Sequence, residues 1–210
     1  MTIYLFTGTP GSGKSLHQAM NIHWALKTKK PVIANFEIDA SSYQLGLFYF
    51  VDNPQMTPEF LEKFALEYFS NHDDRRKNRE GSIKLYLDEC QLLFNARDWN
   101  AKDRLKWVRF FSQHRKLGYD IYMVAQFDTM IDKQIRSLVE YEVKHRKFNN
   151  FGKFGQLLNV LLAGRALCVG VTYWYGMKER LGSEFFLGRK RYYELYDTLK
   201  LFSSKEPDHG

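Results

Sequence analysis

Gly8-Thr9-Pro10-Gly11-Ser12-Gly13-Lys14-Ser15 is the stretch of sequence that decides the fold. It matches the pattern G-x-x-x-x-G-K-[ST], the P-loop of nucleotide-binding proteins. Its glycines let the backbone curve closely around phosphate oxygens, and its amides point at the negative charge. Lys14 is expected to reach the β- and γ-phosphates and the Ser15 hydroxyl to coordinate Mg²⁺. Leu16, the next residue, completes the predicted phosphate-binding set.

The flanking sequence has the strand–loop–helix order that a P-loop requires. Residues 2–7 are β-branched, aromatic and apolar, and they predict a buried strand. From Lys14 to Leu26 the apolar residues recur at helical spacing, and the basic residues 27–30 followed by Pro31 predict the end of that helix. Residues 32–36 predict a second buried strand. This order indicates an α/β protein with a mostly parallel sheet flanked by helices.

An acidic pair follows the next predicted strand, residues 83–87. Asp88 is expected to hold Mg²⁺ through a water, and Glu89 to orient and deprotonate an attacking water. Hydrolytic P-loop enzymes commonly carry such a second acid, whereas simple nucleotide kinases usually lack it. The pair therefore favours Mg²⁺-dependent hydrolysis of a nucleoside triphosphate. A nucleotide kinase or other phosphotransferase stays open as an alternative, as does a scaffold that binds nucleotide without hydrolysing it.

Three further polar residues are candidates for the same site. Gln126 closes a predicted strand, residues 120–125, and strand ends line the ligand crevice of an open α/β sheet. It is expected to bond the γ-phosphate or the attacking water. Arg115 precedes this strand and Arg136 follows it, so either is a candidate arginine finger acting across a subunit interface. Surface ion pairing is the alternative for each arginine.

The remaining chain predicts one core with additions. Residues 1–150 are predicted to form the core, with an insertion at 37–80, a β-rich appendage at 151–200 and a flexible tail at 201–210. In the insertion, Thr57 and Pro58 begin a helix that runs to about residue 69, and the charge run 71–80 predicts a solvated loop. Further helices are expected at 101–117 and 130–139, and strands at 141–147, 166–175, 185–187 and 192–195.

Composition limits the class of protein. Hydrophobic residues make up 44% of the 210 residues and charged residues 26%, which excludes a disordered or collagen-like chain. The formal net charge of +7 permits an anionic partner without requiring one. Cys90 and Cys168 are expected to be buried, reduced thiols. We find no signal peptide, and Arg165 divides the longest apolar stretch, residues 157–176, so we expect a soluble chain in the cytosol.

A late cluster mixes cations with aromatic residues. It comprises Lys144, His145, Arg146, Lys147 and Lys153 together with Phe148, Phe151 and Phe154. Grooves that bind single-stranded nucleic acid use this mixture. Ordinary strand ends and acidic membrane surfaces use it too, so these alternatives stay open.

Several segments together resemble the zonular occludens toxin (Zot) family, whose phage members are the gene I assembly proteins of filamentous phages. They are the P-loop, Asp88-Glu89, Gln113-His114-Arg115, Gly118-Tyr119-Asp120-Ile121, Gln126, residues 132–139 and Tyr192-Tyr193-Glu194-Leu195-Tyr196. The resemblance spans about residues 2–200. The P-loop alone is shared by very many proteins, so the later segments carry the resemblance.

The resemblance implies an ATPase domain at the cytoplasmic face of the bacterial inner membrane, and the choice of ATP over GTP rests on it. Family members assemble and extrude virions together with coat proteins and a secretin, and similar motor ATPases act as rings of identical subunits. Phage single-stranded DNA is a further candidate partner. In this additional-strand class, a strand separates the P-loop strand from the Asp-Glu strand, here residues 120–125. Typical members continue into a membrane-spanning helix, so membrane contact is expected through a segment outside this chain.

Overall fold

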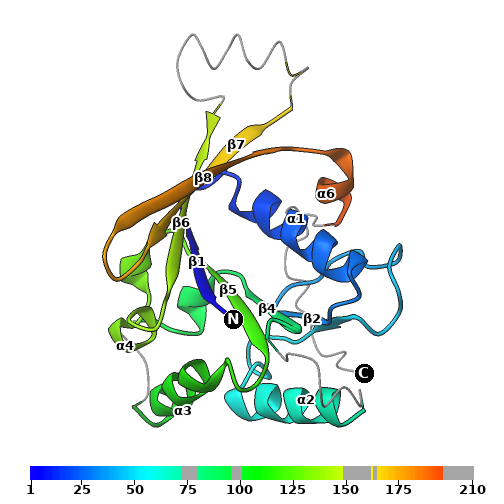
Figure 1. Cartoon of the computed structure of the whole chain (residues 1–210), viewed down its shortest axis with the longest axis vertical. Helices are drawn as coiled ribbons and strands as arrows, with labels where there is room; N and C mark the ends of the chain where they lie inside the picture. Colours follow the sequence, from blue (N-terminus) through cyan, green and yellow to red (C-terminus); the bar gives the residue numbers. More distant parts are fainter. Residues whose placement is uncertain (72–79, 96–100, 149–161, 163–164, 196–210) are drawn as a thin grey trace, which may run out of the picture.

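The computed structural model describes residues 1–71, 80–95, 101–148, 162 and 165–195, without the side chains of residues 71, 101 and 102. Its centre is a sheet of eight strands in the order β3-β2-β4-β5-β1-β6-β7-β8 (Figure 1). The strands are β1 (Ile3–Thr7), β2 (Val32–Ala34), β3 (Phe48–Phe50), β4 (Ile83–Leu87), β5 (Tyr119–Val124), β6 (Tyr141–Lys147), β7 (Leu167–Trp174) and β8 (Glu179–Leu187). In this spatial order, all strands from β3 through β6 run parallel to their neighbours. At the other edge, β7 pairs antiparallel with β6, and β8 pairs antiparallel with β7.

The position of β5 confirms the strand order expected of the additional-strand class. On one side β5 pairs with β1, with Ile121 opposite Ile3. On its other side it pairs with β4, with the same residue opposite Leu85. The P-loop strand and the strand that ends in Asp88 are therefore separated by one strand. Parallel strands place their carboxyl ends at the same edge of the sheet, so the P-loop, Asp88 and Gln126 gather there.

Helices cover both faces of the sheet (Figure 1). On one side lie α2 (Pro58–Asn71), α3 (Ala101–Gln113) and α4 (Lys133–Arg136), and on the other lie α1 (Lys14–Lys27) and α6 (Lys190–Leu195). Short 3-10 helices, η1 (Cys90–Leu92) and η2 (Asp128–Met130), follow β4 and β5. Strand side chains alternate between the two cores, because the strand repeat is two residues. Leu85 belongs to the core that includes residues of α2 and α3, and Tyr86 to the core that includes residues of α1 and α6.

The start of α2 confirms its predicted cap, because the Phe60 amide donates to Thr57 Oγ1 over 3.2 Å. Two other helices are shorter than expected. The helix predicted at 101–117 ends at Gln113, after which turns lead to Gly118 with a φ of +80°. The helix predicted at 130–139 is only α4, which is capped by the Asp132 side chain. Cys90 and Cys168 are free and buried, as expected.

The prediction of a strand at residues 192–195 is wrong, because these residues belong to α6. Tyr192 and Leu195 are both buried in the core that includes α1, and their spacing of three residues is helical. β7 and β8 continue the central sheet beside β6. The greater part of the charge run 71–80, Phe151, Lys153, Phe154 and the predicted tail 201–210 lie outside the described residues.

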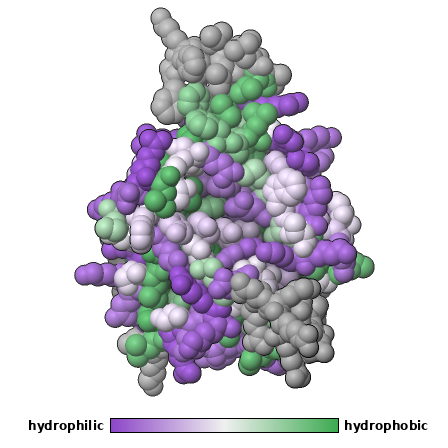
Figure 2. Space-filling model, in the orientation of Figure 1, coloured by the Kyte–Doolittle hydropathy of each residue, from purple (hydrophilic) through white to green (hydrophobic). Residues whose placement is uncertain are grey.

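Figure 2 shows hydrophilic side chains around the margins of the molecule and apolar ones gathered near the end where β6, β7 and β8 meet. Within the described ranges, no helix has both the length and the apolar character needed to cross a membrane.

Candidate nucleotide-binding site

The loop between β1 and α1 has a backbone that depends on glycine. Gly8, Gly11 and Gly13 have φ angles of +145°, +72° and +99°, which disfavour other residues. A Cβ on Gly13 would lie 2.5 Å from Cys168 Sγ, and a Cβ on Gly8 would lie 2.7 Å from the carbonyl oxygen of His145. A Cβ on Gly11 would meet nothing within 4 Å, so the loop is open on that side.

The inner surface of this loop fits a chain of phosphates. Gly13 is the N-cap of α1 and has no side chain to cap the first amides of the helix, which leaves them for an anion. Lys14 Nζ donates to the carbonyl oxygens of Gly8 (2.7 Å) and Thr9 (3.2 Å), so the cation lies over the loop. Ser12 Oγ is buried and has no partner among the described residues. Amides, an ammonium group and a buried hydroxyl are the donors that phosphate oxygens accept from.

The acidic pair after β4 lies close to Lys14. Burial lowers the pKa of the Lys14 ammonium, and the charges of Glu89 and Asp88 partly offset that shift. Glu89 adopts the left-handed conformation (φ 44°, ψ 46°), which turns the chain out of β4 at this point. Its amide donates to Asp88 Oδ1 over 3.0 Å, and the side-chain amide of Gln91 donates to its carboxylate. The charges of the two predicted acids therefore act on the P-loop lysine.

Asn35, the residue after β2, holds the backbone of Asp88 from both sides. Its Oδ1 accepts from the Asp88 amide over 2.7 Å, and its Nδ2 donates to the Asp88 carbonyl over 2.9 Å. Nδ2 also donates to Asn53 Oδ1 over 2.8 Å, and Asn35 is only 4% exposed. We call this pair of bonds the Asn35 clamp. These bonds continue the pairing of β2 with β4 by one residue. They thereby hold the backbone of Asp88, the first residue of the acidic pair, in a fixed position relative to β2.

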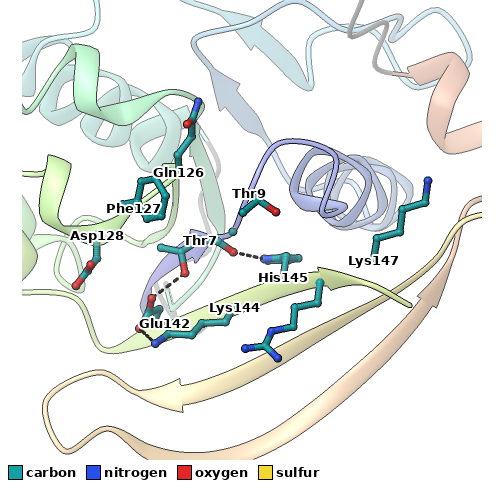
Figure 3. A pocket seen from close by; sticks show the side chains of 11 residues that line it. Thr7, Thr9, Gln126, Phe127, Asp128, Glu142, Lys144, His145 and Lys147 are labelled. Atoms are coloured by element: carbon teal, nitrogen blue, oxygen red, sulfur yellow. Dashed lines mark hydrogen bonds and ion pairs between the residues drawn. The ribbon is translucent and has the colours of Figure 1, made fainter. Parts of the chain in front are cut away.

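Gln126 follows β5 and lies directly beside the P-loop. Its carbonyl oxygen accepts from the Gly8 amide over 3.3 Å. In Figure 3 its side chain points away from Glu142 and Lys144. The backbone bond places this residue beside the start of the P-loop.

The two candidate arginines lie in different places. Arg115 is exposed and pairs with Glu140 over 3.0 Å, before β5 and β6 begin. This is the amino end of the strands, whereas the P-loop lies at the carboxyl end, so Arg115 faces away from the P-loop of its own chain. Arg136 lies on α4 and donates to the carbonyl oxygen of Asp128, two residues after Gln126, over 3.3 Å.

Two buried histidines, His17 and His145, form hydrogen bonds next to the P-loop. His145 Nδ1 donates to the carbonyl oxygen of Thr7 over 3.3 Å, and its Nε2 accepts from His17 Nδ1 over 2.9 Å. Burial lowers the pKa of His17 to about 4 and that of His145 to about 3, so both rings are neutral near pH 7. These bonds join the end of β1 to α1 and to β6.

A cavity of about 510 Å³ adjoins the start of the P-loop. Thr7 to Thr9, Gln126 to Asp128 and residues of β6 line it (Figure 3). Inside it Thr7 Oγ1 donates to Glu142 Oε1 over 2.7 Å, and Lys144 Nζ lies 3.5 Å from Glu142 Oε2. His145 and Lys147 also line it, as do Gly8 and Thr9, so the cavity opens directly beside the phosphate loop.

Comparison with known proteins identifies the family. The model of the zonular occludens toxin (Zot) family matches residues 2–186. The chain belongs to the Zot family. A curated relative, the Gene 1 protein of Enterobacteria phage M13, is 29% identical over 97% of this chain, and the match covers 61% of that relative. The chain thus spans about three fifths of the length of such relatives.

Solved structures confirm the fold of this Zot-family chain. The N-terminal domain of zonular occludens toxin from Neisseria meningitidis has a TM-score of 0.51 at 17% identity, covering 93% of this chain and 98% of that one. B204, the DNA-packaging ATPase of Sulfolobus turreted icosahedral virus, has a TM-score of 0.52 at 14% identity, covering 90% and 97%. Both likenesses concern the fold, which is that of the P-loop NTPases.

Sequence reasoning missed three supports of the Zot-family site: the Asn35 clamp, Glu142 and the His17–His145 pair. Each joins residues far apart in the chain, such as Thr7 and Glu142 at a separation of 135 positions. The only local signal was a polar residue at the end of a buried strand, which Asn35 provides.

Proposed function

We propose that this chain is the ATP-binding and ATP-hydrolysing motor domain of a filamentous-phage assembly protein. The observation that carries the proposal is the position of the P-loop and of the strand ending in Asp88 and Glu89 at the same carboxyl edge of the sheet, where both acids act electrostatically on Lys14. A phosphate-binding lysine beside two carboxylates suits hydrolysis, because one acid can serve the metal while the other activates water.

We assign the roles as follows. The P-loop amides and Lys14 hold the phosphates, and Ser15 and Asp88 would hold Mg²⁺. A bound Mg²⁺ would neutralise charge on the β- and γ-phosphate oxygens. Glu89 accepts a proton from the attacking water, and Gln126 orients that water or the γ-phosphate. The Asn35 clamp holds the backbone of Asp88 in place where β4 ends.

The biological setting of the proposal rests on the Gene 1 relatives of filamentous phages. We propose that the whole protein acts at the inner membrane of the host, where it assembles and extrudes virions together with coat protein and a secretin. Oligomerisation belongs to this proposal, with an arginine of one subunit completing the site of the next. Arg115 faces away from its own P-loop, which suits a role in a neighbouring copy.

The test is Mg²⁺-dependent ATP hydrolysis over a series of protein concentrations, with nucleotide binding measured in parallel. We expect the rate per protomer to rise with concentration and to vanish in Lys14→Ala. Glu89→Gln should bind ATP as well as the unmodified chain and lose at least about a hundredfold in rate. Unchanged hydrolysis in Glu89→Gln would refute the assigned base. ATP binding without hydrolysis at every concentration, and in an oligomer enforced by fusion, would favour the scaffold alternative.

A further inference from the structure

One face of β6, β7 and β8 carries an unusual set of side chains. Directly paired residues of antiparallel strands point to the same side of a sheet, so the strand registers define this face. Its members are Glu142, Lys144 and Arg146 of β6, Val169, Val171 and Tyr173 of β7, and Arg180, Ser183 and Phe185 of β8. We call it the β6–β8 face. The opposite face packs against α1 and the P-loop through Cys168 and Phe186.

The charge of the β6–β8 face is positive. Lys144 is 51% exposed and Arg146 and Arg180 are exposed too. The acid on this face, Glu142, is largely buried and already accepts from Thr7 Oγ1 and pairs with Lys144. Within the described part of the chain, no hydrogen bond or ion pair holds Arg146. Cations thus exceed acids, and one guanidinium is available to a ligand.

Aromatic rings lie among these cations. The Lys144 ammonium lies 5.2 Å from the centre of the Tyr173 ring. Phe185 is 60% exposed at the outer strand, and Phe127, at the rim of the adjoining cavity, is 56% exposed. Water-exposed rings beside cations can stack on the bases of an unpaired strand while the cations contact its phosphates.

The spacing of the cations suits an extended polyanion. Lys144 and Arg146 are two positions apart on one strand, which places their Cα atoms about 7 Å apart on the same side. This is close to the separation of neighbouring phosphates in an extended single strand. A duplex keeps its bases stacked on one another, so the rings of this face could not engage them.

We propose that the β6–β8 face, together with the cavity of about 510 Å³ beside Thr7, binds single-stranded nucleic acid. Lys144 and Arg146 contact phosphates, and Tyr173 and Phe185 stack on bases. The cavity wall includes Gly8 and Gln126, so the bound strand lies next to the P-loop. The coupling of this strand to a motor rests on the proposed function, whereas the binding itself needs no hydrolysis.

The test measures the anisotropy of a labelled oligothymidylate of about 20 nucleotides, titrated with the full chain without ATP. The decisive variant is Lys144→Ala/Arg146→Ala. Its matched control is Lys63→Ala/Lys190→Ala, which removes the same charge from exposed positions on α2 and α6. We expect the first variant to bind at least about tenfold more weakly in about 50 mM salt, and its salt slope to fall by about 1.4. The control should change affinity less than twofold.

A second pair of variants tests stacking without a change of charge. Phe185→Ala should weaken binding about fivefold or more, whereas Phe50→Ala, at an exposed ring of the opposite edge strand, should not. Equal losses in variant and control, tighter binding of a duplex, or easier displacement by polyglutamate than by unlabelled oligothymidylate would each overturn the proposal. ATP binding is measured on the same samples. A variant that no longer binds oligothymidylate but still binds ATP would therefore show that this site is separate from the nucleotide site.

Discussion

Replacing Asn35 should damage the site more than its distance from the phosphate loop suggests. Asn35→Ala removes both bonds of the Asn35 clamp and leaves the amide and carbonyl of Asp88 without their partner. Each such group costs about 1–3 kcal/mol when fully buried, and both bonds are only partly buried, so we expect the free energy of unfolding to fall by about 2–4 kcal/mol. The released backbone carries Asp88 and Glu89, and a displacement of about 1 Å in an active site can cost about a hundredfold in rate.

The assay combines urea unfolding with kcat and nucleotide affinity. Asn35→Asp keeps the acceptor for the Asp88 amide and loses the donor to its carbonyl, so its effects should fall between those of Ala and Asn. Asn53→Ala is the control, because it removes only the 2.8 Å bond to Asn35 and should cost about 1 kcal/mol. We expect kcat to fall at least about tenfold in Asn35→Ala with little change in ATP affinity. Equal destabilisation by Asn35→Ala and Asn53→Ala, with kcat unchanged, would refute the reasoning.

Three further predictions concern the phosphate loop and its support. Gly13→Ala should abolish nucleotide binding, because the added Cβ would clash with Cys168. Gly11→Ala should cost only about 1 kcal/mol of backbone strain, because its Cβ would meet nothing within 4 Å. Calorimetric titration with ATP and thermal melts compare the two variants. Acidification should destabilise the fold, because the pKa of His145 is lowered from 6.5 to about 3 and the unfolded chain therefore binds a proton that the folded chain does not. The loss begins as the pH falls below about 6.5 and amounts to about 2 kcal/mol by about pH 5, so urea unfolding should show a shallower pH dependence in His145→Gln. Thr7→Val should leave the Glu142 carboxylate without its hydroxyl donor and cost about 1–3 kcal/mol in the same assay, and no loss there would show that water replaces this donor.

The sequence predicted those parts of the fold and site that depend on neighbouring residues. The P-loop, the strand that ends at Asp88 and the cap at Thr57 are each set by short patterns, and the structure places them as expected. The order of β1, β5 and β4 came from the family resemblance. The strand predicted at residues 192–195 was wrong because so short a run with a few apolar positions fits the strand period as well as the helical one. Packing against α1 favours the helix.

Long-range bonds could not be predicted in the same way. Asn35 and Asp88 are 53 positions apart, and Thr7 and Glu142 are 135 apart. Which polar side chain meets which backbone group depends on strand register, and register is fixed by the packing of the whole sheet. A polar residue at a strand end therefore indicates a site, but not its partner.

The supports of the P-loop also explain how the two proposed sites can influence each other. On one side the loop is joined to β5 through Gly8 and Gln126, and on the other to β6 through Thr7. Thr7 contacts β6 on both of its faces, since its carbonyl meets His145 and its hydroxyl meets Glu142. Glu142 in turn pairs with Lys144, which we assign to the nucleic-acid strand. A shift of the loop on phosphate binding or release would therefore alter the partner of that lysine directly. From Thr7, the residue before the P-loop, a hydrogen bond and an ion pair lead through Glu142 to Lys144, so a motor built on this fold would need no distant hinge to connect the two sites.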